Sequence, residues 1–190
     1  MTDRFRPIAS ETLSDGWGRL TRHRFALRRL DGAWDEQARE VYDRGDAVAC
    51  LLHDPAAGTV LLVRQFRLPE HLAGREAFMI EAPAGFLDGA DPEDRVRAEL
   101  MEETGFEARD LAHVVDLVPS PGSVKERIAC FLGRYDRAAP AGAGGGKPDE
   151  GEDIEILHLP LAEALAGIGS GRITDAKTVV LIQALALAER

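Results

Sequence analysis

The chain has 190 residues, 45% hydrophobic and 29% charged, which is the balance of a soluble protein with one core and at most a short extra layer. Its formal net charge of −10 opposes attraction to a nucleic-acid backbone, so we expect no nucleic-acid partner. The first ten residues lack the apolar region of a signal peptide, and no apolar stretch is long enough to span a membrane. We therefore expect a soluble, cytoplasmic protein with no membrane contact.

The two cysteines, Cys50 and Cys130, each lie in an apolar run. This placement is typical of small core residues and does not indicate a disulfide or a metal site. The cysteine pattern agrees with a reducing, intracellular compartment.

The first 46 residues predict a strand-rich extension. One strand is expected over residues 18–30, followed by the turn signal Asp31-Gly32, and a second strand over residues 35–43. Residues 47–52 are continuously apolar, which is typical of a strand buried on both faces.

The remaining chain alternates short strands with helices. A helix is expected from the cap Asp91 to Gly105, another over residues 160–168, and a last one from Thr174 or Asp175. Further strands are predicted at residues 59–66, 78–82, 113–118, 127–135 and 153–159. Mixed strands with a few helices on their faces predict an α/β sandwich rather than a helical bundle. The glycine-rich stretch 138–151 is expected to be a flexible surface loop.

Three glutamates share one face of the first of these helices. Glu99, Glu102 and Glu103 are spaced i, i+3 and i+4, so their side chains project from the same side. Like charges at this spacing repel, and the negative end of the helix dipole disfavours anions in the last turn. A bound divalent cation reverses both effects, and carboxylate oxygens are ligands that Mg²⁺ and Mn²⁺ prefer. A solvated acidic face is the alternative explanation.

The segment around this helix, GFLDGADPEDRVRAELMEETGF (residues 85–106), resembles the Nudix box. The carboxyl half matches the usual pattern at Glu99, Leu100, Glu102, Glu103, Gly105 and Phe106. The amino half departs from it, because Gly85 lies one residue too close to the glutamates and Ala98 stands where the box has arginine. In the family that arginine supports the loop and the carboxylates, so its loss puts the rate in doubt.

The shortened box is similar to that of the Nudix GDP-mannose pyrophosphatases. The similarity extends along nearly the whole chain through seven short motifs, which are REVYDRG (39–45), RQFR (64–67), PAG (83–85), SPG (120–122), GGG (144–146), EDIE (152–155) and DAKT (175–178). ADP-ribose pyrophosphatases share several of these motifs, so the reaction is better defined than the base and the sugar.

The resemblance implies a Nudix-type α/β/α sandwich with a mixed sheet over residues 47–190 and an N-terminal strand extension over residues 1–46. It implies Mg²⁺, with Mn²⁺ as the alternative, held by Glu99 and Glu103 with support from Glu102 and from the Ala84 carbonyl. Metal ions would neutralise the diphosphate charge and activate water. GDP-mannose would then yield GMP and mannose 1-phosphate.

A further carboxylate is expected from the glycine-rich loop, as a metal ligand or as a general base. Glu152 is the first choice and Glu150 the alternative, although loop acids are usually only solvated. If Glu152 acts in catalysis, the loop becomes a lid rather than a linker.

Substrate contacts are expected from four regions of the chain. Arg64 or Arg67 would bind phosphate, and the resemblance favours Arg67. Trp17 would stack on the base, Glu126 would lie near the metals unless it is an exposed loop acid, and Lys177 resembles a lysine that contacts substrate in the subfamily.

Relatives exchange the N-terminal strands between subunits, so the resemblance also predicts a homodimer in which Trp17 reaches the partner's site. Two other hypotheses stay open. One is an ADP-ribose pyrophosphatase, and the other is a Nudix module that binds nucleotides without turnover, for which Ala98 and the short loop are the main arguments.

Overall fold

The computed structural model describes residues 3–189, which divide into two compact units. Residues 3–46 and 118–127 form an N-terminal unit, and residues 47–117 and 128–189 form a core unit.

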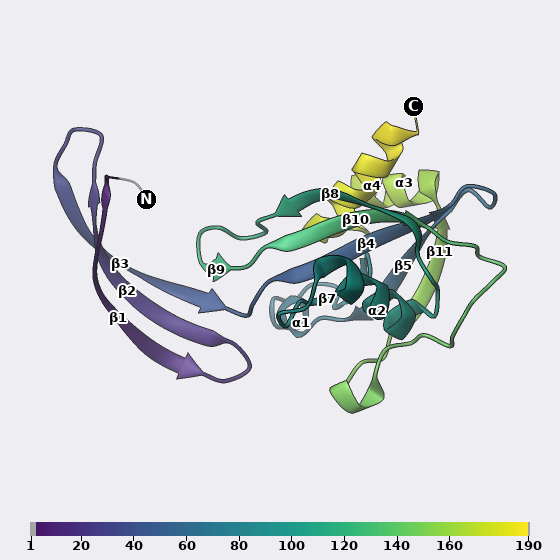
Figure 1. Cartoon of the computed structure of the whole chain (residues 1–190), viewed down its shortest axis with the longest axis horizontal. Helices are drawn as coiled ribbons and strands as arrows, with labels where there is room; N and C mark the ends of the chain where they lie inside the picture. The colour runs from purple at the N-terminus through teal and green to yellow at the C-terminus, as the bar shows by residue number, and fades with distance from the viewer. Residues whose placement is uncertain (1–2, 190) are drawn as a thin grey trace. The chain divides into compact units, whose positions relative to one another are not determined.

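The N-terminal unit is an antiparallel sheet of three long strands (Figure 1). Its strands are β1 (Phe5–Asp15), β2 (Arg19–Arg28) and β3 (Trp34–Asp43), and the short β9 (Val124–Lys125) pairs parallel to β3. The two strands predicted here are confirmed, whereas β1 was missed. Its register shifts at two places along β2, so its side chains do not alternate regularly enough to signal a strand. None of the described side chains in this unit is buried.

The core unit contains a mixed sheet in the order β11-β5-β4-β10-β8. Its strands are β4 (Ala47–Asp54), β5 (Thr59–Phe66), β8 (Arg109–Leu117), β10 (Ile128–Arg134) and β11 (Glu155–Pro160). β4 and β10 run parallel, and the other neighbours in this order are antiparallel. Two short strands also pair with this sheet. β6 (Phe78–Glu81) pairs antiparallel with β5, and β7 (Ala84–Phe86) pairs antiparallel with β4.

Helices lie on both faces of this sheet. They are α1 (Leu68–Leu72), α2 (Pro92–Thr104), α3 (Leu161–Ser170) and α4 (Ala176–Ala188). A short 3-10 turn, η1 (Pro148–Glu150), lies between β10 and β11. As predicted, Asp91 caps α2 by accepting hydrogen bonds from the Glu93 and Asp94 amides, and Gly105 ends it in the left-handed conformation. Asp175 caps α4.

The alternation of side chains along β4 separates two cores. Ala47, Ala49 and Leu51 pack against α3 and α4, whereas Val48, Cys50 and Leu52 pack against Val96 and Leu100 of α2 and their neighbours. The predicted α/β/α sandwich with a mixed sheet is therefore confirmed. Both cysteines are buried and unpaired, as expected for core residues. No helix within residues 3–189 is long and apolar enough to cross a membrane.

Candidate active site

The last turns of α2 carry two buried glutamates against β7. Glu99 is 6% exposed and Glu103 is 2% exposed, and the Ala84 amide donates a hydrogen bond of 3.1 Å to Glu103 Oε2. Glycine is required at position 85, because a Cβ there would overlap the Glu99 carboxylate. The loop before α2 and the carboxyl half of the helix are thus fitted to each other.

Both carboxylates are poorly compensated by the protein itself. Burial, followed by repulsion from Glu99, raises the pKa of Glu103 to about 8 although the Ala84 amide opposes the shift. Burial also raises the pKa of Glu99, where Arg95 opposes it and the charges of Glu102 and Glu152 add to it. Glu103 would be mostly ionised at neutral pH only with an additional positive charge beside it.

Arg95 connects α2 to the loop before it, three residues ahead of Ala98. Its side chain forms an ion pair with Glu99, one turn along α2, and its Nε donates a hydrogen bond of 2.9 Å to the Phe86 carbonyl of β7. Arg97, in contrast, pairs with Glu93 and with the Ala108 carbonyl. The helix–loop connection is therefore present, one turn earlier than the usual pattern has it.

The third helix glutamate and the loop acids meet around one lysine. Lys147 Nζ lies 2.8 Å from Glu102 Oε2 and 3.3 Å from Glu150 Oε1, and the Lys147 amide donates to Glu152 Oε2 at 2.8 Å. Sequence reasoning missed Lys147, although a single basic residue in the acidic stretch GGGKPDEGED was the available signal.

The glycine-rich loop has a defined backbone contact with the end of α2. The Gly145 and Gly146 amides donate to the carbonyls of Glu103 and Glu102 at 2.8 and 3.1 Å, which satisfies carbonyls that the helix leaves without intrahelical partners. Gly144, Gly145 and Gly146 all have positive φ, a conformation that favours glycine. The flexibility predicted for the stretch, and its role as a lid or a linker, stay predictions.

The residues at this site fit a divalent cation by chemistry and by charge. In the described part of the chain, no three His, Cys, Asp or Glu side chains already form a ready-made metal cluster. The donors are nonetheless hard oxygens, and Glu99 and Glu103 are buried with too little positive charge around them. Glu102 is meanwhile paired with the Lys147 ammonium group, a cation of the protein itself, whereas Glu152 accepts a hydrogen bond from the Lys147 backbone amide.

A further buried carboxylate, Glu81, binds two cationic side chains. Arg67 donates to it in bidentate fashion, Nε to Oε1 at 2.6 Å and Nη2 to Oε2 at 2.9 Å. Lys177 Nζ donates to the same Oε2 at 2.6 Å and to Asp175 Oδ2 at 2.9 Å. Arg67 and Lys177, both predicted as substrate contacts, are thus brought together. Sequence reasoning missed Glu81, an acid in the apolar run FMIEAPAG.

The two arginines of the RQFR motif have different partners. Arg64 lies at the exposed end of β5, where its Nη1 pairs with Glu155 Oε2 at 3.2 Å across the β5–β11 pairing. Arg67 follows the strand and is bound to buried Glu81. The preference for Arg67 over Arg64 as a phosphate contact stays a prediction.

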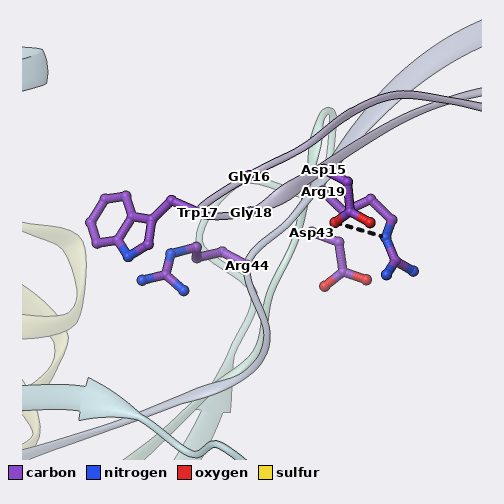
Figure 2. Close-up of a pocket in the computed structure, with 7 residues that line it drawn as sticks. All are labelled: Asp15, Gly16, Trp17, Gly18, Arg19, Asp43 and Arg44. Carbon is purple, nitrogen blue, oxygen red and sulfur yellow. Dashed lines mark ion pairs between the residues drawn. The ribbon is translucent and has the colours of Figure 1, made fainter.

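Trp17 and Glu126 belong to the N-terminal unit. Trp17 lies in the β1–β2 turn, is 82% exposed, and its ring lies 4.0 Å from the Arg44 guanidinium. Figure 2 shows these two side chains together on one side of an open pocket of about 310 Å³, with the Asp15–Arg19 ion pair on the other. Glu126 follows β9. The roles predicted for both residues stay predictions.

The fold and this site define a class. The Nudix domain model matches residues 43–177, so the chain belongs to the Nudix family of hydrolases. The model of the GDP-mannose pyrophosphatase NudK N-terminal domain matches residues 4–42. A GDP-mannose pyrophosphatase from Pectobacterium atrosepticum is 45% identical over 93% of this chain and 91% of its own.

Two further relatives extend the comparison. A GDP-mannose pyrophosphatase from Escherichia coli (strain SMS-3-5 / SECEC) is 41% identical over 97% of this chain and 96% of its own. A crystal structure of an ADP compounds hydrolase superposes with a TM-score of 0.73, covering 98% of this chain and 94% of that one. Its 18% identity makes it a likeness of fold alone. The protein is thus an enzyme of the Nudix pyrophosphatase type, and Nudix hydrolases use divalent metal ions.

Proposed function

We propose that this protein hydrolyses GDP-mannose to GMP and mannose 1-phosphate by adding water across the diphosphate bond. The choice of GDP-mannose as substrate rests on matches that extend over both units of the chain. The N-terminal family model and the relatives at 41–45% identity all bear the name GDP-mannose pyrophosphatase. The buried carboxylates of Glu99 and Glu103 on α2, whose pKa values are raised, support the reaction class independently of any name.

Mg²⁺ is the proposed metal, with Mn²⁺ as the alternative. Glu99, Glu103 and the Ala84 carbonyl would hold it. Glu102 would join when the Lys147 side chain is displaced, and Glu152 would join from the loop. The metal would neutralise the charge of the diphosphate and acidify water.

Glu152 is the proposed loop carboxylate that receives a proton. Its charge raises the pKa of both Glu99 and Glu103, so it lies within electrostatic range of the two buried glutamates. Glu150 is exposed and pairs with Lys147. These contacts favour Glu152 over Glu150.

Arg67 is the proposed contact to the diphosphate. Its side chain is 39% exposed while that of Glu81 is 4% exposed, so the pair presents its cation to solvent. Lys177 is only 8% exposed and would contribute one remaining N–H at most. Arg64, with an exposed carboxylate partner, ranks below both.

The N-terminal unit is the proposed dimerisation segment. A three-stranded sheet whose described side chains all remain unburied has no core of its own, and such sheets need a partner surface for stability. It exposes Phe5, Ile8 and Leu30, which suits burial against a second copy. Trp17 and Glu126 would then contribute to a site shared between copies. The two unpaired cysteines support a cytoplasmic location.

The test is product analysis on the purified protein with GDP-mannose and with ADP-ribose, each in Mg²⁺ and in EDTA. The proposal expects GMP from GDP-mannose in Mg²⁺ and none in EDTA. Faster release of AMP from ADP-ribose would keep the reaction class and overturn the substrate. A monomeric mass by analytical ultracentrifugation at micromolar concentration would contradict the dimer.

A further inference from the structure

The Glu81 carboxylate is saturated by donors from two distant parts of the chain. Its three hydrogen bonds of 2.6 to 2.9 Å come from Arg67, which follows β5, and from Lys177 in the first turn of α4. All three donors are N–H groups of cations. A carboxylate, which offers two acceptor oxygens and no donor, suits this arrangement, whereas an amide would turn its own N–H₂ towards at least one of them.

The charges around Glu81 balance within the cluster. Burial alone would raise the pKa of Glu81, but the charge of Lys177 and the hydrogen bonds from Arg67 and Lys177 outweigh it and lower the pKa to about 2. Asp175 supplies the second negative charge to Lys177. Two cations and two anions thus form a neutral network, buried at Glu81 and Lys177 and partly exposed at Arg67 and Asp175, whose members hold one another in place.

Two hydrogen bonds connect this network to the segment that precedes the Ala84 carbonyl, a proposed metal ligand. Lys177 binds Glu81, and the neighbouring Thr178 hydroxyl accepts a hydrogen bond of 2.6 Å from the Ala82 amide. The first turn of α4 therefore holds residues 81 and 82, two positions before Ala84. The rigid first turn is itself ordered by the Asp175 cap.

The Arg67 guanidinium has one bound edge and one open edge. Nε and Nη2 donate hydrogen bonds to Glu81, whereas Nη1 donates none to any residue among 3–189. Its charge also acts on Glu103, which places the guanidinium within electrostatic range of the glutamate pair on α2. A group that bridges the metal site and a fixed cation would be an extended dianion such as a diphosphate.

We propose that Glu81 is the positioning residue of this site, a buried carboxylate that fixes the direction of Arg67 towards the substrate diphosphate and is itself anchored by Lys177. This inference rests on the proposed function, in which Arg67 binds the diphosphate. Glu81 touches neither substrate nor metal and acts through Arg67.

A matched control lies a few residues away. Arg75 and Glu70 form the same bidentate pair, with distances of 2.6 and 2.8 Å, but five residues apart and at the surface of α1. Replacing Glu70 by Gln removes a pair of equal geometry that is connected to no substrate group.

The first experiment is a double-mutant cycle on hydrolysis of GDP-mannose in Mg²⁺. Glu81→Gln and Arg67→Met are each expected to lower kcat/KM by about 10- to 100-fold, mainly through KM, and Glu70→Gln by less than twofold. Adding Glu81→Gln to Arg67→Met should lower kcat/KM by less than about threefold further, because the guanidinium that Glu81 positions is already absent. Effects that multiply would overturn the inference.

The second experiment needs neither substrate nor metal. The Arg67 Nε–H signal in a ¹⁵N NMR spectrum, identified by its loss in Arg67→Lys, should exchange slowly with water and should vanish in Glu81→Gln while the Arg75 signal persists. An Arg67 signal that persists in Glu81→Gln would overturn the inference. If the signal vanishes but the wild-type protein leaves GDP-mannose intact, the pairing stands and the proposed function fails.

Glu81→Asp is the second variant, for the case that Glu81→Gln does not fold. It keeps the charge beside Lys177 but is one methylene shorter, so it cannot reach both cations. The expected result is a folded protein with the same rise in KM and the same loss of the Arg67 signal. Wild-type kinetics in Glu81→Asp would contradict the positioning role.

Discussion

Two buried glutamates of the core unit, Glu81 and Glu103, have the same side chain and nearly the same exposure, 3% and 2%. Their pKa values move in opposite directions, to about 2 for Glu81 and to about 8 for Glu103. The difference comes from their partners. Glu81 has two cations in direct contact, whereas Glu103 has a single backbone amide and the nearby charge of Glu99.

The comparison shows how one fold builds two kinds of carboxylate site. Around Glu81 the protein supplies its own cations, so the site is complete and its geometry is fixed. Around Glu103 it supplies none in direct contact, an arrangement that suits a cation from solution. A buried carboxylate without a cation beside it, such as Glu103, is a candidate ligand for a metal ion.

Removing the negative charge of Glu103 is expected to have the largest effect. Glu103→Gln should lower kcat by about 10³-fold, because a metal ligand is lost. In EDTA at pH 9 the same change should raise the unfolding temperature, since it removes a buried charge without a partner. Glu81→Gln should lower the unfolding temperature under the same conditions, because it leaves Arg67 without its counterion and Lys177 with Asp175 alone. Calorimetric unfolding of both variants checks this, and equal shifts in one direction would contradict it.

Gly85→Ala tests the fit between the loop and the helix. The added Cβ would overlap the Glu99 carboxylate and push it away from Glu103, so kcat/KM should fall by about 10²-fold. The matched control is Gly169→Ala in α3, where an added Cβ meets no atom within 4 Å, and unchanged kinetics are expected there. Full activity in Gly85→Ala would show that Glu99 does not need its present position.

Lys147 is expected to have the smallest effect. It is an internal counterion of Glu102 and competes there with a metal. Lys147→Met should therefore strengthen Mg²⁺ binding by about two- to fivefold, a small change because the ion pair is partly exposed to solvent. Lys125→Met removes a similar lysine–carboxylate pair with Asp43 in the N-terminal unit and should leave Mg²⁺ binding unchanged. Weaker binding in Lys147→Met would mean that the lysine shapes the loop and does not compete with the metal.

The parts of the molecule that were predictable from sequence are the local ones. The limits of α2 follow from Asp91 and Gly105, and the shared face of its glutamates follows from helical spacing. The fold class followed from the order of the elements and from the Nudix resemblance, and the fold and the family are confirmed.

The missed features depend on contacts far along the chain. Glu81 meets Arg67 over 14 residues and Lys177 over 96, so no window of sequence contains the cluster. Lys147 reaches Glu102 only because the glycine loop turns back onto α2. The strand β1 has an irregular register and no buried side chain, which removed the pattern that identifies a strand.

Proton release on Mg²⁺ binding would show whether Glu103 stays without a counterion until a metal binds. With a pKa of about 8 in the metal-free protein, Glu103 is mostly protonated at pH 7 and must lose its proton to bind a cation, so affinity should rise with pH up to about 8. Calorimetry in two buffers of different ionisation enthalpy should show release of roughly one proton per ion at pH 7 and nearly none at pH 9. Glu103→Gln should abolish the release, and Mg²⁺ binding without any proton release at pH 7 would contradict the account.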